Sequence, residues 1–133
     1  MACAFGTQRS RYQSAVAIQQ YSGTAPVTEK SGKNQHWVHR RWARPHFTHQ
    51  SFFEYASQSV LHCQWAKLFL KEQMTRGKAY PTAIRALAFK WQRIMFVCWR
   101  HRVPYDETIY LQSLKRRGSH LARKLNQQLS KAT

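Results

Sequence analysis

The chain is most apolar over the segment PTAIRALAFKWQRIMFVCW, from Pro81 to Trp99. Proline is well tolerated in the first turn of a helix, so Pro81 marks a helix start. Apolar residues then recur at three- and four-residue spacing, which places them on one helical face. That inward face comprises Ile84, Leu87, Ala88, Trp91, Ile94, Met95 and Cys98. The opposite, outward face carries Arg85, Lys90, Arg93 and Arg100.

The segments on both sides of this helix also have helical spacing. Residues 52–74 show apolar positions three and four apart, which predicts one long helix or two abutting ones, ending before Gly77. Beyond Pro104, Asp106 is placed to cap another helix, which ends before Gly118. Three leucines then recur every four residues among basic and amide residues, so the tail forms an amphipathic helix or is frayed. They are Leu121, Leu125 and Leu129.

The N-terminal third is less regular. Ser14 can cap a short helix that runs to Tyr21, with Gly23 just past its end. The following residues, 22–33, contain Gly23, Pro26 and Gly32 and few β-formers, which indicates an irregular loop with room for one short strand. The predicted fold class is therefore mostly α: a small helical domain with an irregular basic loop near the N-terminus and a possible short strand.

Charge is the strongest compositional signal. The 133 residues include 22 Lys and Arg but only 5 Asp and Glu, for a formal charge of +17, so we expect a polyanionic partner. The three cysteines form no CxxC pair, which is typical of reduced thiols. The most apolar segment contains basic residues, so neither a signal peptide nor a membrane span fits. We expect a soluble cytoplasmic protein without a membrane partner.

Seven histidines raise the question of a metal site. His36 and His39, like His46 and His49, stand three residues apart, but zinc sites have firmer spacing and usually paired cysteines. We therefore predict no metal ligands, and histidines that face nucleic acid or solvent. The five acids are also too few for a two-metal nuclease site. Asp106 is a predicted cap, and Glu54 and Glu72 are expected to be solvated on helices.

The aromatic residues divide into two groups. Those at helical apolar positions are expected in the core, because aromatic stripes at that spacing are usually buried. They are Trp91, Trp65, Phe52 and Phe69. Trp37 and Trp42 instead alternate with histidines and arginines, a pattern that favours stacking on bases or flanking a phosphate backbone.

A single serine, Ser31, lies in the basic stretch GTAPVTEKSGKNQHWVHRRW, from Gly23 to Trp42. A serine hydroxyl attacks phosphorus only if a base takes its proton and positive charge surrounds the developing phosphorane. Five nearby residues could supply that charge: Lys30, Lys33, Arg40, Arg41 and Arg44. On local chemistry alone a turn is the more common role of a Ser-Gly pair, with a nucleophile as the alternative.

Longer sequence motifs help to decide between the two roles of Ser31, a turn residue and a nucleophile. The segments YSGTAPVTEKSG and RALAFKW…PYDE, together with WVHRRW, QSFFEYASQSV and YLQSLKRRG, resemble the C-terminal domain of the insertion-sequence one-ten family of transposases. The similarity runs in order from Ala4 to Gly118. It implies residues 1–118 as that domain, with a serine-bearing basic region over 1–45, a helical part over 46–118, and a basic amphipathic tail over 119–133.

The resemblance also implies a chemistry. In that family an N-terminal RuvC-like domain carries an acidic metal site, and the C-terminal serine attacks DNA to form a covalent phosphoserine link. The family serine falls on Ser31, five residues after Pro26. The implied partners are DNA, a structured bridge RNA, and full-length transposase or a second copy of the chain. We expect no cofactor here, and Mg²⁺ only in the RuvC-like domain.

Two departures from the family pattern limit that expectation. The RuvC-like domain is absent, and the chain starts at MACAFGT where an upstream hairpin of the PGIG type is expected. This predicts an N-terminally truncated transposase that is inactive alone. The alternatives are a non-catalytic nucleic-acid-binding fragment and a decayed remnant. The predicted nucleic-acid contacts are Lys30, Lys33, Arg40, Arg41, Arg44, Trp37 and Trp42, with Ser31 as the catalytic position.

Overall fold

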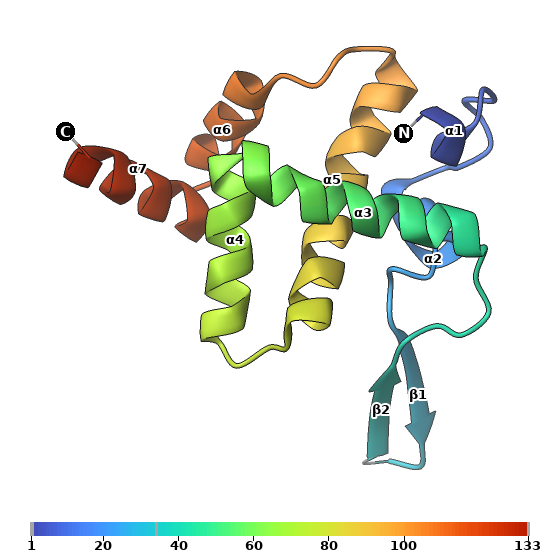
Figure 1. Ribbon diagram of the computed structural model, residues 1–133. Coiled ribbons are helices and arrows are strands. Elements are labelled where there is room, and N and C mark those ends of the chain that lie inside the picture. The colour runs from blue at the N-terminus through green and yellow to red at the C-terminus, as the bar shows by residue number, and fades with distance from the viewer. Residues whose placement is uncertain (1, 34, 133) are drawn as a thin grey trace.

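The computed structural model describes residues 2–33 and 35–132, with the backbone alone described for residues 2, 3 and 35–37 (Figure 1). Helices make up most of it, and one small antiparallel sheet stands apart from them, so the predicted fold class is confirmed. The elements are α1 (Ala2–Phe5), α2 (Ala15–Tyr21), β1 (Val27–Ser31), β2 (Gln35–His39), α3 (His46–His62), α4 (Gln64–Thr75), α5 (Tyr80–His101), α6 (Glu107–Arg116) and α7 (His120–Ala132).

Helix α5 is the centre of the core, as its apolar spacing predicts. It packs against α2, α3 and α4, and its Trp91 ring lies 4.7 Å from that of Trp65 between centroids. Trp91, Trp65 and Phe52 are all buried, and Phe69 is partly buried. The expectation that these aromatics belong to the core is confirmed. Removing such large rings from water supplies much of the favourable free energy of folding.

Buried polar bonds fix α2 against α5. The Gln92 amide donates to Ser22 Oγ at 2.7 Å, and the Gln19 amide donates to the carbonyl of Phe89 at 2.9 Å. All three polar side chains are almost fully buried. Because an unsatisfied buried polar group is costly, these bonds hold α2 in one place on α5. The strand that follows α2 therefore starts from a fixed point.

The helix boundaries settle two open alternatives. Residues 46–75 form two helices rather than one, since Cys63 between them has extended backbone angles of φ −114° and ψ 117°. The tail forms α7, which packs on α4 and α6 and buries Leu121 and Leu125. Asp106 caps α6, as predicted, by accepting from the backbone N–H of Thr108 at 2.8 Å. The division at residue 118 stays a prediction.

The region predicted as an irregular loop is a β-hairpin, made of β1 and β2. Val27 pairs with His39 at its base and Ser31 with Gln35 at its tip. The possible short strand within the predicted loop is confirmed as β1, whereas β2 was not predicted. The hairpin projects from the helical body (Figure 1). In the part of the chain that the structure describes, no helix is both long and apolar enough to cross a membrane.

Candidate nucleic-acid-binding site at the hairpin

Ser31 lies at the tip of the hairpin, as the last residue of β1. Its side chain is exposed, and Gly32 turns the chain immediately after it with φ +68°. A positive φ of this kind favours glycine, which explains why the Ser-Gly pair can form the turn. Among the side chains that the structure describes, which do not include those of residues 34–37, none forms a hydrogen bond with Ser31. The hydroxyl is therefore accessible to a ligand, and no described base is bonded to it.

The two lysines predicted beside Ser31 differ in their placement. Successive side chains of a strand point to opposite faces, so Glu29 and Ser31 share one face of β1 and Lys30 lies on the other. Lys33 is an exposed residue of the turn. Strand alternation therefore directs Lys30 away from the Ser31 face, whereas Lys33 lies beyond the strand and is not directed to either face by it.

The acid on the Ser31 face, Glu29, is paired with a histidine. Its Oε1 lies 3.0 Å from Nε2 of His39, whose Nδ1 lies 3.0 Å from the carbonyl oxygen of Arg40. The bond to that carbonyl, followed by the bond to Glu29, raises the pKa of His39 above its ordinary value of 6.5. When His39 is protonated, it offsets the negative charge of Glu29, which would otherwise repel a phosphate.

Arginines gather where the hairpin joins the body. The guanidinium of Arg40 stacks over Trp42 with 4.1 Å from Cζ to the ring centroid, and the Trp42 side chain remains 68% exposed. Arg44 Nη1 donates to the carbonyl of Arg41 at 2.6 Å. A base or sugar could therefore pack on Trp42 beside two guanidinium groups. The side chain of Trp37, also predicted as a contact, lies outside the described residues.

Arg44 is held in position by close packing on Gly23. Gly23 has φ +75°, and a Cβ at this position would lie 2.3 Å from Cδ of Arg44. Only glycine leaves room for that approach. The end of α2 and the segment after β2 therefore meet at this point, and the meeting fixes where the arginines stand.

Two further residues near these arginines come from distant segments and were not among the predicted nucleic-acid contacts. Arg85 of α5 is half-buried, and its pKa is lowered first by burial and then by the charges of Arg40 and Arg44. His49 of α3 contacts the carbonyl of Ser22 through Nδ1 at 2.9 Å. Burial lowers its pKa, and so do the charges of Arg44 and Arg85. We call Arg40, Arg41, Arg44 and Arg85 the arginine cluster.

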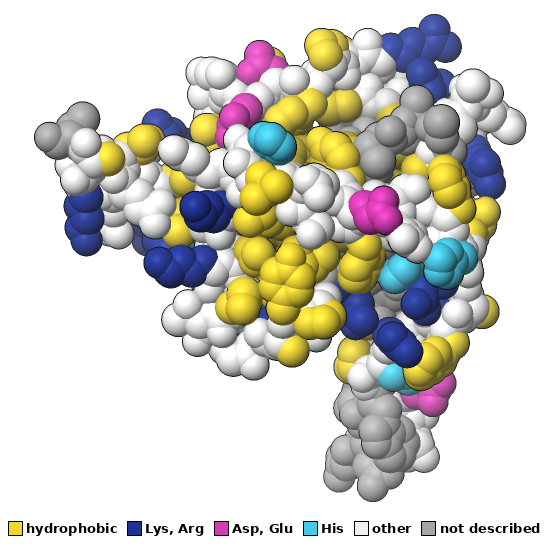
Figure 2. Space-filling model, viewed as in Figure 1, with side chains coloured by type: hydrophobic (Ala, Val, Ile, Leu, Met, Phe, Trp, Pro, Cys, Tyr) yellow, Lys and Arg dark blue, Asp and Glu magenta, His cyan; other side chains and the backbone are white. Residues whose placement is uncertain are grey.

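The arginine cluster has positive charge that the described residues do not neutralise. The ion pairs formed by those residues involve only Glu29 and Glu72, and neither pairs with an arginine of the cluster. Within the same residues, the Nε atoms of Arg41 and Arg85 are buried and lack a hydrogen-bond partner. Figure 2 shows Lys or Arg and His side chains together at the foot of the hairpin. Such a surface attracts an anion that brings its own acceptor atoms.

The predicted site residues thus form two groups rather than one. Ser31 stands four residues along β1 from Val27 at the base, a length of about 13 Å at about 3.3 Å per residue. A strand of duplex DNA rises about 3.4 Å per nucleotide, so this length corresponds to about four nucleotides. The tip and the arginine cluster would therefore contact different phosphates of one nucleic acid.

The described residues do not fit a divalent metal site. No three or more His, Cys, Asp or Glu among them lie close enough to share one ion. Glu29, the acid of β1, is paired with His39, and His49 is bonded to a backbone carbonyl. A Mg²⁺ ion of the kind that the resemblance implies would need ligands beyond these residues.

Comparison with known proteins gives one informative similarity. The chain is 28% identical over 102 residues to a protein of Streptomyces coelicolor named "Mini-circle putative transposase for IS117". The match covers 77% of this chain and 24% of that protein, so the chain spans about a quarter of its relative's length. No family model and no solved structure matches. The similarity supports a relationship to transposases.

Proposed function

We propose that this chain is the serine-bearing, nucleic-acid-binding part of a DNA transposase, with Ser31 as the residue that attacks DNA. The observation that carries the proposal is the position of Ser31, exposed at the tip of a projecting hairpin whose foot holds the arginine cluster. The similarity to a named transposase supports the same function. Transposition or recombination of DNA is the general activity, and the covalent role of Ser31 is its most specific element.

The proposed reaction is a transesterification at phosphorus. The Ser31 hydroxyl loses its proton to a base, and its Oγ forms a bond to the phosphorus of a phosphodiester. The bond between that phosphorus and one deoxyribose oxygen then breaks, and the leaving oxygen takes up a proton. Lys33 stabilises negative charge near the attacked phosphate, and the arginine cluster binds a phosphate about four nucleotides away.

The chain alone is expected to be inactive in this reaction. Among the described residues, neither a base bonded to Ser31 nor a metal site is present, so further catalytic groups must come from outside them. The family resemblance assigns those groups to a RuvC-like domain. We further propose a structured RNA as a second nucleic-acid ligand, and full-length transposase or a second copy of the chain as the protein partner.

A second candidate function is nucleic-acid binding without catalysis. The formal charge of +17 and the unneutralised arginine cluster support it without any role for Ser31. The two functions share a binding surface and differ in the serine. They can therefore be separated by one experiment on Ser31 and one on the arginines.

The binding experiment measures the affinity for a fluorescent DNA duplex by anisotropy between about 50 and 200 mM salt. The variant R40Q/R44Q/R85Q removes three cluster charges, and R102Q/K115Q/R116Q removes three exposed charges elsewhere as the matched control. Each phosphate contact contributes about 0.9 to the slope of log affinity against log salt, so the cluster variant should lose about 2.7 in slope. Equal losses of salt slope in the two variants would contradict a phosphate contact specific to the arginine cluster.

The catalytic experiment replaces the matched segment of the Streptomyces coelicolor relative with this chain. The chimera is incubated with DNA, and a covalent complex is sought on a denaturing gel, with the relative itself as the reference. Ser31→Ala should abolish the complex, whereas Ser10→Ala, at an exposed serine of the N-terminal loop, should retain it. A complex that survives Ser31→Ala supports the second candidate function for the hairpin.

A further inference from the structure

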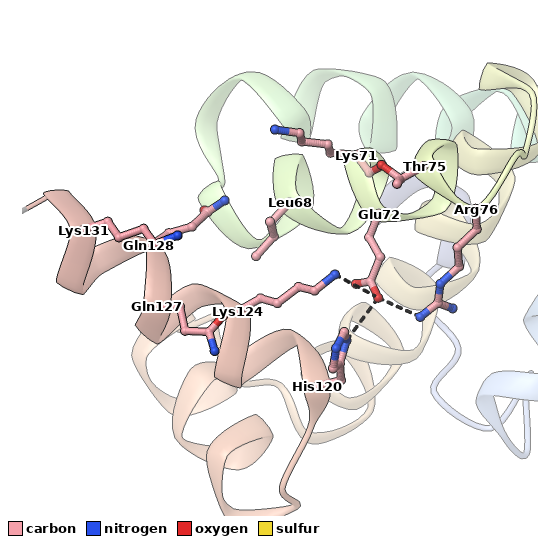
Figure 3. A pocket seen from close by; sticks show the side chains of 10 residues that line it. All are labelled: Leu68, Lys71, Glu72, Thr75, Arg76, His120, Lys124, Gln127, Gln128 and Lys131. Atoms are coloured by element: carbon pink, nitrogen blue, oxygen red, sulfur yellow. Dashed lines mark hydrogen bonds and ion pairs between the residues drawn. The ribbon is translucent and has the colours of Figure 1, made fainter.

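A second basic site lies between α4 and α7, away from the hairpin. The two helices border a groove of about 480 Å³, and its charged lining residues are Lys71, Glu72, Arg76, His120, Lys124 and Lys131 (Figure 3). In Figure 1, α7 and the hairpin stand on opposite sides of the molecule. The groove is therefore a separate feature from the proposed site of Ser31.

One carboxylate organises this groove. Glu72 Oε1 lies 2.7 Å from Nη2 of Arg76, 3.1 Å from Nδ1 of His120 and 3.6 Å from Nζ of Lys124. The Glu72 side chain is only 9% exposed, so the expectation that it is solvated was wrong. Its burial results from the packing of α7 on α4. The contacts hold basic side chains from the C-terminal end of α4 and from α7 in defined positions.

The positive charge around Glu72 exceeds what one carboxylate can neutralise. Within the described part of the chain, the ammonium groups of Lys71 and Lys131 form no ion pair or hydrogen bond. The pKa of Lys90 in α5 is lowered mainly by burial and next by the charge of Arg93. The charge of Glu72 acts in the opposite direction and raises it. Four Lys and Arg side chains line the groove against one acid, which leaves a net positive surface with unused donors.

We propose that the α4–α7 groove binds the sugar-phosphate backbone of a nucleic acid, independently of Ser31. Phosphodiester oxygens accept hydrogen bonds and carry negative charge, and the groove offers ammonium, guanidinium and amide donors, the last from Gln127 and Gln128. Glu72 already restricts the side chains of Arg76 and Lys124, so they lose less conformational entropy when a ligand binds. The backbone of either DNA or RNA supplies the required chemistry.

The groove and the hairpin lie on opposite sides of the molecule, which limits how one nucleic acid can bind to both. One short duplex segment cannot lie in both places at once, so the two sites engage separate nucleic acids or distant parts of a bent one. Binding at the groove should therefore be measurable when the hairpin site is disabled. Nucleic-acid binding at the groove is therefore independent of the proposed function, since it does not require Ser31 to attack DNA.

The test uses the whole chain and the variant K71Q/K131Q, which removes the two unpaired lysines and leaves the Glu72 contacts intact. R102Q/K115Q is the matched control, because it also carries two charges fewer than the wild-type +17 and alters exposed residues away from the groove. Affinity is measured by fluorescence anisotropy on a short DNA duplex and an RNA duplex of the same sequence. Thermal unfolding confirms that both variants remain folded.

If the groove binds DNA, the groove variant should reduce the salt slope on the DNA duplex by about 1.8, from two contacts at about 0.9 each. When the salt concentration rises from about 50 to about 200 mM, the affinity of K71Q/K131Q should therefore fall by a factor about 12-fold smaller than the affinity of wild type does. A larger effect of K71Q/K131Q on the RNA duplex than on DNA would assign the groove to RNA, and the reverse to DNA. The effect should persist in the R40Q/R44Q/R85Q background.

Two outcomes would overturn the proposal. Equal changes in slope for K71Q/K131Q and R102Q/K115Q would mean that only the overall charge matters. Displacement of the duplex from R40Q/R44Q/R85Q by polyglutamate as readily as by an unlabelled duplex would identify the groove as a site for an acidic protein segment. A failure of Ser31 to form a covalent complex would contradict the proposed function and leave the groove unaffected.

Discussion

Replacing Gly23 with alanine tests how the arginine cluster is held. The substitution has two costs. An L-residue at φ +75° is strained by about 1–2 kcal/mol. The new methyl group would also lie 2.3 Å from Cδ and 2.8 Å from Cβ of Arg44. Because rotation of the Arg44 side chain cannot move its own Cβ, the backbone must shift, at a cost of about 1–3 kcal/mol for overpacking.

The matched control is Gly77→Ala. Gly77 has φ +86°, but a Cβ there would meet nothing within 4 Å, so this substitution carries the strain without the clash. Urea unfolding of both variants should show Gly23→Ala to be the more destabilising by about 1–3 kcal/mol. The Gly23→Ala variant should also bind DNA more weakly than Gly77→Ala, because the shift displaces Arg44. Equal free energies of unfolding for the two variants would refute the close packing.

A double-mutant cycle isolates the contact itself. Arg44→Ala removes the Cγ and Cδ atoms that the methyl group of the Gly23→Ala variant would meet, and only the 2.8 Å approach of Cβ remains. Arg44→Ala should therefore cost less stability in the Gly23→Ala background than in the wild type. A coupling free energy of about 1 kcal/mol is expected for residues in direct contact. Strict additivity of the two substitutions would contradict the packing account.

Three further predictions concern the core, a helix end and the hairpin. Ser59→Ala leaves the buried indole N–H of Trp91 without its 2.8 Å partner and should lower the free energy of unfolding by about 1–3 kcal/mol in urea titrations. Asp106→Ala removes the cap of α6 and should cost about 1 kcal/mol, whereas Asp106→Asn should retain most of the stability. NMR titration should give His39 a pKa above 6.5, and Glu29→Gln should lower it only in part, since the bond to the Arg40 carbonyl remains. Because that pKa is raised by folding, the His39 contacts stabilise the hairpin fully below pH 6.5 and lose their effect as pH rises through the folded value.

The helical body was predictable because its signals are local. The spacing of apolar residues along α5 and the caps at Ser14 and Asp106 depend on neighbours within a few residues. The second strand of the hairpin was missed for the opposite reason. β1 is exposed along most of its length, so no alternation of buried and exposed residues marks the pair, and its register depends on cross-strand contacts.

The site was predictable only in part. Ser31 could be named from its motif and the basic residues after β2 from their charge and proximity to it, but their separation along the hairpin depends on the register. Arg85 was predicted on the outward face of α5, and the structure shows that this one residue of the face lies near Arg40 and Arg44 at the foot of the hairpin. Glu72 was expected in solvent because α7, which covers it, begins 48 residues later. Contacts of this kind depend on packing between segments that are distant in the sequence, so local patterns do not indicate them.

Identifying the amino acid that carries DNA in a trapped covalent complex tests directly whether Ser31 is the nucleophile. The chimera is reacted with DNA, the complex is digested with nuclease and protease, and the modified peptide is sequenced by mass spectrometry. We expect a phosphodeoxynucleotide on Ser31, at the exposed tip of the hairpin. A nucleotide on any other residue, with Ser31 unmodified, would contradict it.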